Sequence, residues 1–322
     1  MKIISDPKLD FDEVLLVPKR SGLRSRSEVE LEREFKYIPF KGIPIIVANM
    51  DHTGTMAMAE ALRPYKVSVA LHKFYSSEEV LKFWSGPDSQ FAFYTLGTSK
   101  DEMVRFKELY DKIYPRYICV DVANGYGAGL IETVSRLREY VDPFSVIMAG
   151  NVVTPDMTYD LLRVGANIVK IGIGPGSACT TRFVTGVGYP QLSAILECAD
   201  AARGVNGHIC ADGGIRSIGD FAKAFAAGAD FVMSGLMFAG HTECNGHFRG
   251  MSSKEVMDEY YGGQNNYRAS EGITIPLMDR GPVFNTVEEI LGGLRSACTY
   301  VGARTLKDLP KCATFVQTRG RK

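Results

Sequence analysis

Eight short apolar runs recur along the chain, and they constrain its fold more than any other feature. They are rich in Val, Ile, Phe and Ala and cover residues 44–50, 68–73, 91–97, 117–123, 145–151, 168–174, 208–214 and 231–237. Amphipathic segments lie between them, for example 76–84, 101–113, 130–141, 155–166 and 218–229. Apolar strands that alternate with such helices are typical of a parallel sheet covered by helices on both faces. Eight such units predict an α/β fold, the closed (β/α)8 or TIM barrel.

Polar residues or glycines follow at the carboxyl end of every predicted strand. In barrels of this kind the active site is built at that face, so these positions are the first candidates for function. They are Asn49, His72, Lys73, Gly97, Asp121, Gly150, Asn151, Gly174, Asp212, Gly213, Gly214, Ser234 and Gly235. An irregular segment, 239–276, follows the last strand, and its Gly, Asn and Ser content predicts a mobile flap over the site.

Charge and cysteine content narrow the class of protein. The chain has 322 residues, enough for one barrel over 1–322, and its 37 basic residues balance 37 acidic ones. This balance argues against nucleic acid or an anionic membrane as a partner. No apolar run reaches membrane-spanning length, and the seven cysteines form an odd set without a CxxC pair. We therefore expect reduced thiols and a cytoplasmic protein.

The loop after the sixth strand, GIGPGSACTTR (172–182), is the strongest candidate for chemistry. Its glycines expose backbone N–H groups, and Arg182 adds positive charge; both favour a thiolate at Cys179. A thiolate there could attack an electron-poor ring carbon and form a covalent intermediate. The alternative is a buried cysteine with a packing role only.

Glycines after the seventh and eighth strands mark a candidate phosphate site. Gly213 and Gly214 stand between a strand and a helix, and Gly235 repeats the pattern one unit later. These are the positions at which barrels commonly bind phosphate through backbone amides. Asp212 is placed to bind a pair of ribose hydroxyls. The alternative is that the glycines only turn the chain.

Three further patterns allow other interpretations. The glycines of VDVANGYGAG (120–129) imitate a dinucleotide fingerprint with the wrong spacing, although Asp121 and Asn124 could still face a nicotinamide. The motif His241-x-x-Cys244-x-x-His247 offers three zinc ligands without a fourth. Lysines at 73 and 170 could form Schiff bases, but at 170, inside a strand, we expect a buried side chain whose ammonium reaches outward to water.

Two long segments resemble one family closely. GPGSACTTRFVTGVGYPQLSAILECADAARG (174–204) resembles the active-site loop of the IMP dehydrogenase / GMP reductase family, and ADGGIRSIGDFAKAFAAGADFVMSG (211–235) resembles its phosphate-binding segment. LDFDEVLLVPKRSGLRSRSEVEL, VDVANGYG, MAGNVVT, TGVGYPQ, YRASEG and LGGLRSACTYVGA are similar to the reductase branch. SVALHKFYSSEEV runs directly into the next helix, where the dehydrogenases usually insert regulatory CBS modules. Their water-activating Arg-Tyr pair is not evident in the flap either.

The resemblance implies a reaction and a set of residues. Cys179 would attack C2 of GMP, ammonia would leave, and a thioimidate would remain. NADPH would then deliver a hydride to C2, and IMP would be released. Thr181 and Glu271 would manage the proton on the departing amine. GMP would be held by Ser177, Asp212, Gly213, Gly214, Ser234, Gly235, Gly250, Met251, Ser252, Arg268, Ser270 and Gly272. The cofactor would face Lys73, Asp121, Val122, Ala123, Asn151, Ile173 and Gly174.

The resemblance also implies an assembly and an ion. Ser25 and Arg26, with Ser296, Ala297, Cys298 and Thr299, would reach the cofactor from a neighbouring subunit of a homotetramer. Carbonyls of Gly174, Gly176 and Cys179 would bind potassium. Two alternatives stay open: an IMP dehydrogenase without CBS modules, and a non-catalytic barrel that binds purine nucleotides.

Overall fold

A computed structural model describes residues 3–263 and 269–318. Its centre is a closed ring of parallel strands, β3 to β10, in which β10 pairs with β3. The strands are β3 (Lys41–Val47), β4 (Val67–Ala70), β5 (Ala92–Leu96), β6 (Tyr117–Asp121), β7 (Val146–Val152), β8 (Ile168–Ile171), β9 (His208–Asp212) and β10 (Phe231–Ser234). Each predicted run overlaps one of these strands, so the predicted (β/α)8 barrel is confirmed.

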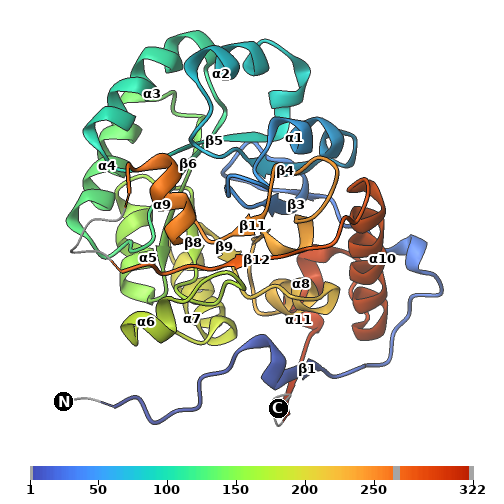
Figure 1. The fold of residues 1–322 in the computed structure, drawn as a ribbon. Coiled ribbons are helices and arrows are strands. Elements are labelled where there is room, and N and C mark those ends of the chain that lie inside the picture. The colour runs from blue at the N-terminus through green and yellow to red at the C-terminus, as the bar shows by residue number, and fades with distance from the viewer. Residues whose placement is uncertain (1–2, 264–268, 319–322) are drawn as a thin grey trace.

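Helices surround the strands (Figure 1). In chain order they are α1 (Met56–Leu62), α2 (Ser77–Trp84), α3 (Lys100–Ile113), α4 (Ala128–Tyr140), α5 (Pro155–Arg163), α6 (Thr181–Thr185), α7 (Gln191–Arg203), α8 (Ile218–Ala226) and α10 (Phe284–Val301). Helix α3 illustrates how the sequence sets their limits. Ser99 and Glu102 form a capping box at its start, and Tyr114 ends it in a left-handed conformation.

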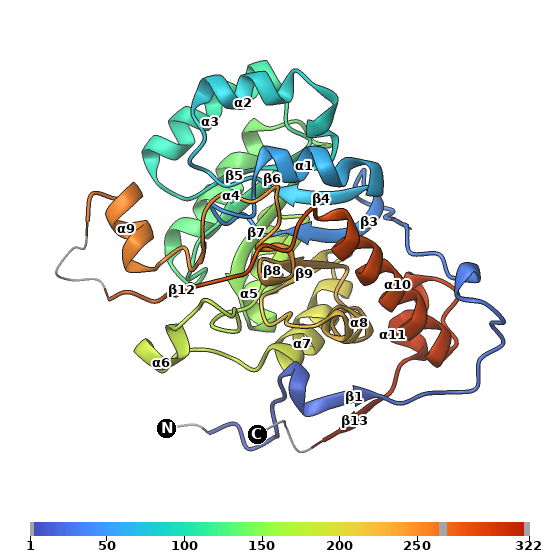
Figure 2. The same cartoon turned by 45° about the vertical axis from the view of Figure 1, so that its right-hand side comes forward.

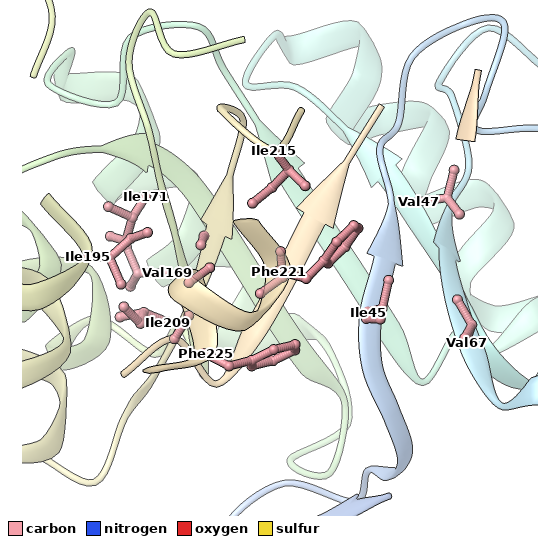
Figure 3. Packing of buried hydrophobic residues seen from close by; sticks show 14 of the residues in the cluster. Ile45, Val47, Val67, Val169, Ile171, Ile195, Ile209, Ile215, Phe221 and Phe225 are labelled. Atoms are coloured by element: carbon pink, nitrogen blue, oxygen red, sulfur yellow. The ribbon is translucent and has the colours of Figure 1, made fainter. Parts of the chain in front are cut away.

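The apolar core has two layers because side chains alternate across each strand. Inside the barrel lies a cluster that includes Phe93, while its neighbour Tyr94 faces the outer layer between strands and helices. Figure 3 shows part of that outer layer, where Phe221 and Phe225 of α8 lie against the strands. At the amino end of the barrel Phe35 stacks on Phe231 with ring centroids 4.8 Å apart. The interior is therefore filled, and a ligand has to bind at the rim.

The segment after β10 lies over the carboxyl ends of the strands. It contains η5 (Leu236–Phe238), β11 (Phe248–Arg249), α9 (Lys254–Tyr260) and β12 (Thr274–Ile275). Strands β11 and β12 pair antiparallel across the mouth of the barrel, and α9 projects to the side in Figure 2. Strands β11 and β12 and helix α9 fall in the predicted flap, 239–276, and η5 precedes it. The mobility of the flap stays a prediction.

Segments near both ends of the described chain pack on the outside of the barrel. The short strand β1 (Val14–Leu16) pairs with β13 (Phe315–Gln317), and β2 (Arg33–Glu34) adds antiparallel to β3. Between them, η2 (Arg26–Glu28) lies against α10, away from the mouth of the barrel (Figure 1). Other short elements are η1 (Phe11–Glu13), η3 (Arg63–Tyr65), η4 (Pro87–Phe91), η6 (Leu306–Asp308) and α11 (Leu309–Cys312).

Candidate active site

Cys179 stands where two pockets meet at the carboxyl ends of the strands. The larger pocket, of about 470 Å³, extends over β5, β6 and β7 toward α9, and the smaller, of about 190 Å³, extends over β9 and β10. Asn49, Asp121, Asp212 and Met251 line both pockets together with Cys179. Two ligands, one bound in each pocket, would therefore meet beside the thiol of Cys179.

A chain of hydrogen bonds leads away from the thiol. Cys179 Sγ donates to Oγ1 of Thr181 over 3.2 Å, and that hydroxyl donates to Oε2 of Glu271 over 2.8 Å. All three side chains are partly buried at the edge of the pocket. A carboxylate at the end of such a chain can accept a proton and return it to a leaving group, as general acid–base catalysis requires.

Backbone pairing places Glu271 beside Thr181. The amide of Thr180 donates to the carbonyl of Glu271 over 3.0 Å, and the amide of Ile273 donates to the carbonyl of Ala178 over 3.0 Å. Cys179 and Gly272 thereby form an isolated antiparallel bridge. The segment that carries the carboxylate is thus paired directly with the cysteine loop.

Two glycines allow this close approach. A Cβ on Gly250 would lie 2.6 Å from the carbonyl oxygen of Ala178, and one on Gly272 would lie 3.1 Å from Cα of Gly250. Both neighbours are backbone atoms, which cannot rotate out of the way as a side chain can. We conclude that these positions require glycine for a steric reason, separate from any contact with a ligand.

The smaller pocket collects the residues expected around the phosphate and ribose. Gly213 and Gly214 adopt positive φ angles of 87° and 81°, a conformation that favours glycine. Just before α8, the amides of Arg216 and Ser217 donate to the carboxylate of Asp220, so these two amides are already occupied. Of the expected substrate residues, this pocket is lined by Ser177, Asp212, Gly213, Gly214, Ser234, Gly235, Gly250 and Met251.

Three of the other expected substrate residues lie on the flap segment. Ser252 lines the larger pocket, whereas Ser270 and Gly272 line neither of the two. The Ser270 hydroxyl lies 3.3 Å from the carbonyl oxygens of Ser252 and Gly272. Arg268 lies outside the described residues.

The larger pocket is lined by every cofactor residue expected from the same chain: Lys73, Asp121, Val122, Ala123, Asn151, Ile173 and Gly174. Residues that the sequence analysis missed complete it, namely Thr98, Ser99, Glu102, Met257 and Tyr261. Lys73 is ion-paired with Glu102 over 2.6 Å. Burial lowers the pKa of Lys73, but the carboxylate of Glu102 outweighs burial, and the pKa of Lys73 is raised. Only Gly97, at the end of β5, hinted at this wall of the pocket.

Lys170 corrects an expectation. Its side chain does not reach water: the residue is 1% exposed, and its ammonium lies 2.5 Å from Asp121 and 2.9 Å from Asp212. Burial opposes the charge, but attraction by the two carboxylates outweighs it and raises the pKa of Lys170 well above its ordinary value. The ion pairs keep this lysine charged, and a Schiff base requires a neutral amine.

Arg182 also lies differently from what the sequence suggested. Its guanidinium donates to the carboxylate of Asp10 over 2.8 Å and to the carbonyl of Tyr189 over 2.6 Å. Because Asp10 takes up this positive charge, Arg182 braces the cysteine loop against the N-terminal segment. The guanidinium expected to act on Cys179 is thus bound by Asp10 and Tyr189.

Comparison with known proteins agrees with this geometry. A family model described as IMP dehydrogenase / GMP reductase domain matches residues 91–321. A GMP reductase of Aeromonas salmonicida is 49% identical over 99% of this chain and 97% of its own length. GMP reductases of Klebsiella pneumoniae (49% identical, 99% and 97%) and Buchnera aphidicola (50% identical, 98% and 96%) match similarly. The chain belongs to the IMP dehydrogenase / GMP reductase family.

The remaining residues that the family resemblance implies lie apart from the two pockets. Ser25 and Arg26 are exposed, and they are the N-cap and the first residue of η2. η2 packs against α10, the helix that carries Ser296, Ala297, Cys298 and Thr299. None of these six lines either pocket of its own chain. The side chain of Cys298 is fully buried, so it is not available to a ligand. The family's cross-subunit site would need the others at a contact between copies.

The structure bears on the two metal sites that the sequence raised. In the cysteine loop the carbonyl of Gly176 accepts the amide of Cys179 over 3.1 Å and keeps a second lone pair for a cation. In the zinc motif, Nδ1 of His241 lies 2.9 Å from the carbonyl oxygen of Gly281, and Cys244 donates to the carbonyl of Phe238. No cluster of three or more His, Cys, Asp or Glu in the described part of the chain could hold a metal ion.

Membrane insertion can be assessed from the helices. Within residues 3–263 and 269–318, none combines the length and the apolarity needed to cross a bilayer.

Proposed function

We propose that this chain catalyses the NADPH-dependent reductive deamination of GMP to IMP with release of ammonia. The observation that carries the proposal is the hydrogen-bonded series Cys179–Thr181–Glu271 at the junction of two pockets. It is supported by curated GMP reductases that are about half identical to the chain over nearly its full length. The proposal makes the chain an oxidoreductase of purine nucleotide interconversion.

The first half of the proposed reaction is a substitution at C2 of guanine. The sulfur of Cys179 bonds to C2 and its proton passes through Thr181 to Glu271. The carboxyl group of Glu271 then returns a proton to the C2 amino group. The C2–N bond breaks, ammonia leaves, and a thioimidate joins Cys179 to the purine.

The second half reduces the same carbon. The residues of the larger pocket would hold NADPH, and the bound cofactor would supply a hydride to C2. The C2–S bond then breaks, the sulfur recovers a proton, and IMP is released. Residues of this chain orient the two ligands: Asp121, Asn151 and Lys73 contact the cofactor, and Asp212 contacts the ribose of the nucleotide. No hydrolytic water is required, so the junction of the pockets has to exclude water rather than activate it.

The proposal assigns the phosphate of GMP to the amides and hydroxyls of Ser177, Gly213, Gly214, Ser234 and Gly235. A potassium ion held by carbonyls of Gly174, Gly176 and Cys179 would keep the cysteine loop in shape. A neighbouring copy in a homotetramer would bring Ser25, Arg26 and residues 296–299 to the cofactor. Light scattering of the purified protein, with and without potassium and NADPH, tests the assembly. A cytoplasmic location stays a prediction from the sequence.

A paired assay tests the proposed reaction. One arm supplies GMP and NADPH and follows cofactor oxidation and ammonia release. The other supplies IMP, NAD⁺ and potassium and follows formation of xanthosine monophosphate. We expect activity in the first arm only, abolished by Cys179→Ala. Xanthosine monophosphate in the second arm would instead identify an IMP dehydrogenase, and silence in both would leave a nucleotide-binding barrel without catalysis.

A further inference from the structure

Lys170 is a buried cation on the floor of the site, and its contacts span four neighbouring strands. It stands on β8, pairs with Asp212 of β9, and reaches across β7 to Asp121 of β6. On β7, Gly150 lies in register with Lys170, and a Cβ there would lie 2.5 Å from Cβ of Lys170. The absence of a side chain at Gly150 leaves the space that the lysine needs.

The two carboxylates bound to Lys170 belong to both pockets. Asp121 and Asp212 each line the larger and the smaller pocket, beside Cys179. Lys170 and Asn151 both donate to the same oxygen of Asp212, Oδ2, over 2.9 Å. Among the described residues, Oδ1 of Asp212 accepts no hydrogen bond and can meet a hydroxyl of a ligand.

Few other charges act on this group. The thiols of Cys119 and Cys210 lie nearby on β6 and β9, and burial raises the pKa of both, so they stay neutral. Lys73 attracts Asp121 from the wall of the larger pocket. One ammonium is therefore the direct counter-charge for two carboxylates, one from each side of the site.

We propose that Lys170 is a positioning residue that couples the two ligand sites. A ligand that binds Asp212 fixes the Asp212–Lys170–Asp121 bridge, and the second ligand then meets Asp121 already in place. By linkage each ligand raises the affinity of the other by the same factor. The inference rests on the proposed function for the identity of the two ligands.

Calorimetric titration measures this coupling directly. IMP is titrated into the protein alone and into the protein saturated with NADP⁺, a pair that cannot return to GMP without ammonia. The same titrations of Cys179→Ala, which cannot form the thioimidate from IMP and NADP⁺, separate binding from hydride transfer. For the wild type we expect NADP⁺ to tighten IMP binding about five-fold or more. In Lys170→Met we expect both ligands to bind more weakly and the coupling factor to fall to within about two-fold of unity.

Lys73→Met is the matched control. Lys73 is also an ion-paired lysine at the site, but of the two pockets it lines only the larger one. We expect this variant to weaken NADP⁺ binding and to retain the coupling factor. Coupling that persists in Lys170→Met, or that is lost equally in Lys73→Met, overturns the inference.

A second variant covers a failure of Lys170→Met to fold, since that change leaves two carboxylates without a counter-charge. Asp121→Asn keeps the Lys170–Asp212 pair and weakens the bridge on the cofactor side. We expect the coupling between IMP and NADP⁺ to disappear, whatever the change in the affinity for IMP alone. Retained coupling in Asp121→Asn overturns the inference, as does a wild type that binds both ligands without coupling. A wild type that binds neither ligand contradicts the proposed function itself.

Discussion

Gly250→Ala should lower activity because it separates the flap segment from the cysteine loop. The new Cβ would lie 2.6 Å from the carbonyl oxygen of Ala178, about 0.8 Å short of an ordinary contact of 3.4 Å. The contact is between two backbones, so no side chain can rotate away to relieve it. The displacement therefore has to be taken up by the pairing between residues 178–180 and 271–273. A shift approaching 1 Å in a catalytic group costs about 100-fold in rate, so we expect kcat to fall by roughly that factor. Overpacking should also cost about 1–3 kcal/mol of unfolding free energy.

The assay follows NADPH oxidation with saturating GMP, together with urea denaturation of the same preparation. Gly86→Ala is the control, because a Cβ there meets its nearest atom at 3.6 Å, far from the site. We expect Gly86→Ala to match wild type in both measurements. If Gly250→Ala keeps kcat within about three-fold of wild type, the close glycine packing does not position Glu271 and the reasoning fails.

Three further predictions concern the relay, the core and an ion pair. Thr181→Val removes the hydroxyl between Cys179 and Glu271, so kcat should fall by about 10²–10⁴ while the melting temperature stays near wild type. Thr181→Ser restores the hydroxyl and should recover much of the rate. Equal rates in wild type, Thr181→Val and Thr181→Ser would exclude a proton path through this residue. Phe221 is fully buried, so Phe221→Ala should lower the free energy of unfolding, measured by urea denaturation, by about 3–5 kcal/mol. Phe144 is exposed, and Phe144→Ala should lower it by about 0.5 kcal/mol or less. Similar losses in the two variants would contradict the assigned core. Burial raises the pKa of Asp51, but hydrogen bonds from His52 and Arg249 outweigh it and leave the pKa below its ordinary value. The ion pair of Arg249 with Asp51 therefore stabilises the fold above the unfolded-state pKa of about 3.9, and this stabilisation is lost as pH falls through the pKa of Asp51 in the folded state. The difference in melting temperature between wild type and Arg249→Met should therefore shrink from pH 6 to pH 3. A difference that stays constant over this range would refute the argument.

Local patterns predicted the barrel well because each strand and helix carries its own periodicity. A strand such as β5 is buried and mostly apolar on both faces, and a helix such as α3 is bounded by its own capping residues. Strand ends were predicted to form the active site, and the pockets lie there. These features depend on neighbours in sequence, and the sequence displays them directly.

The errors concern side chains whose partners are distant in sequence. Lys170 was expected to reach water, but Asp121 and Asp212 neutralise it from strands that the sequence cannot place at hydrogen-bond distance. Arg182 was expected to act on Cys179, but Asp10 from the N-terminal segment binds it. The pairing of Gly250 and Gly272 with the cysteine loop was likewise invisible, because glycine in a loop has many possible causes. Pair contacts of this kind require the assembled fold.

The most direct test of the account is to trap the covalent intermediate. The protein is incubated with GMP and NADP⁺, which fills the cofactor pocket and has no hydride to donate, then quenched and digested for mass spectrometry. We predict release of ammonia and a mass increase on the peptide with Cys179 equal to GMP minus ammonia, absent in Cys179→Ser and reduced in Glu271→Gln. Turnover of GMP by the wild type with NADPH, without any adduct on that cysteine and with activity retained in Cys179→Ser, would contradict the account.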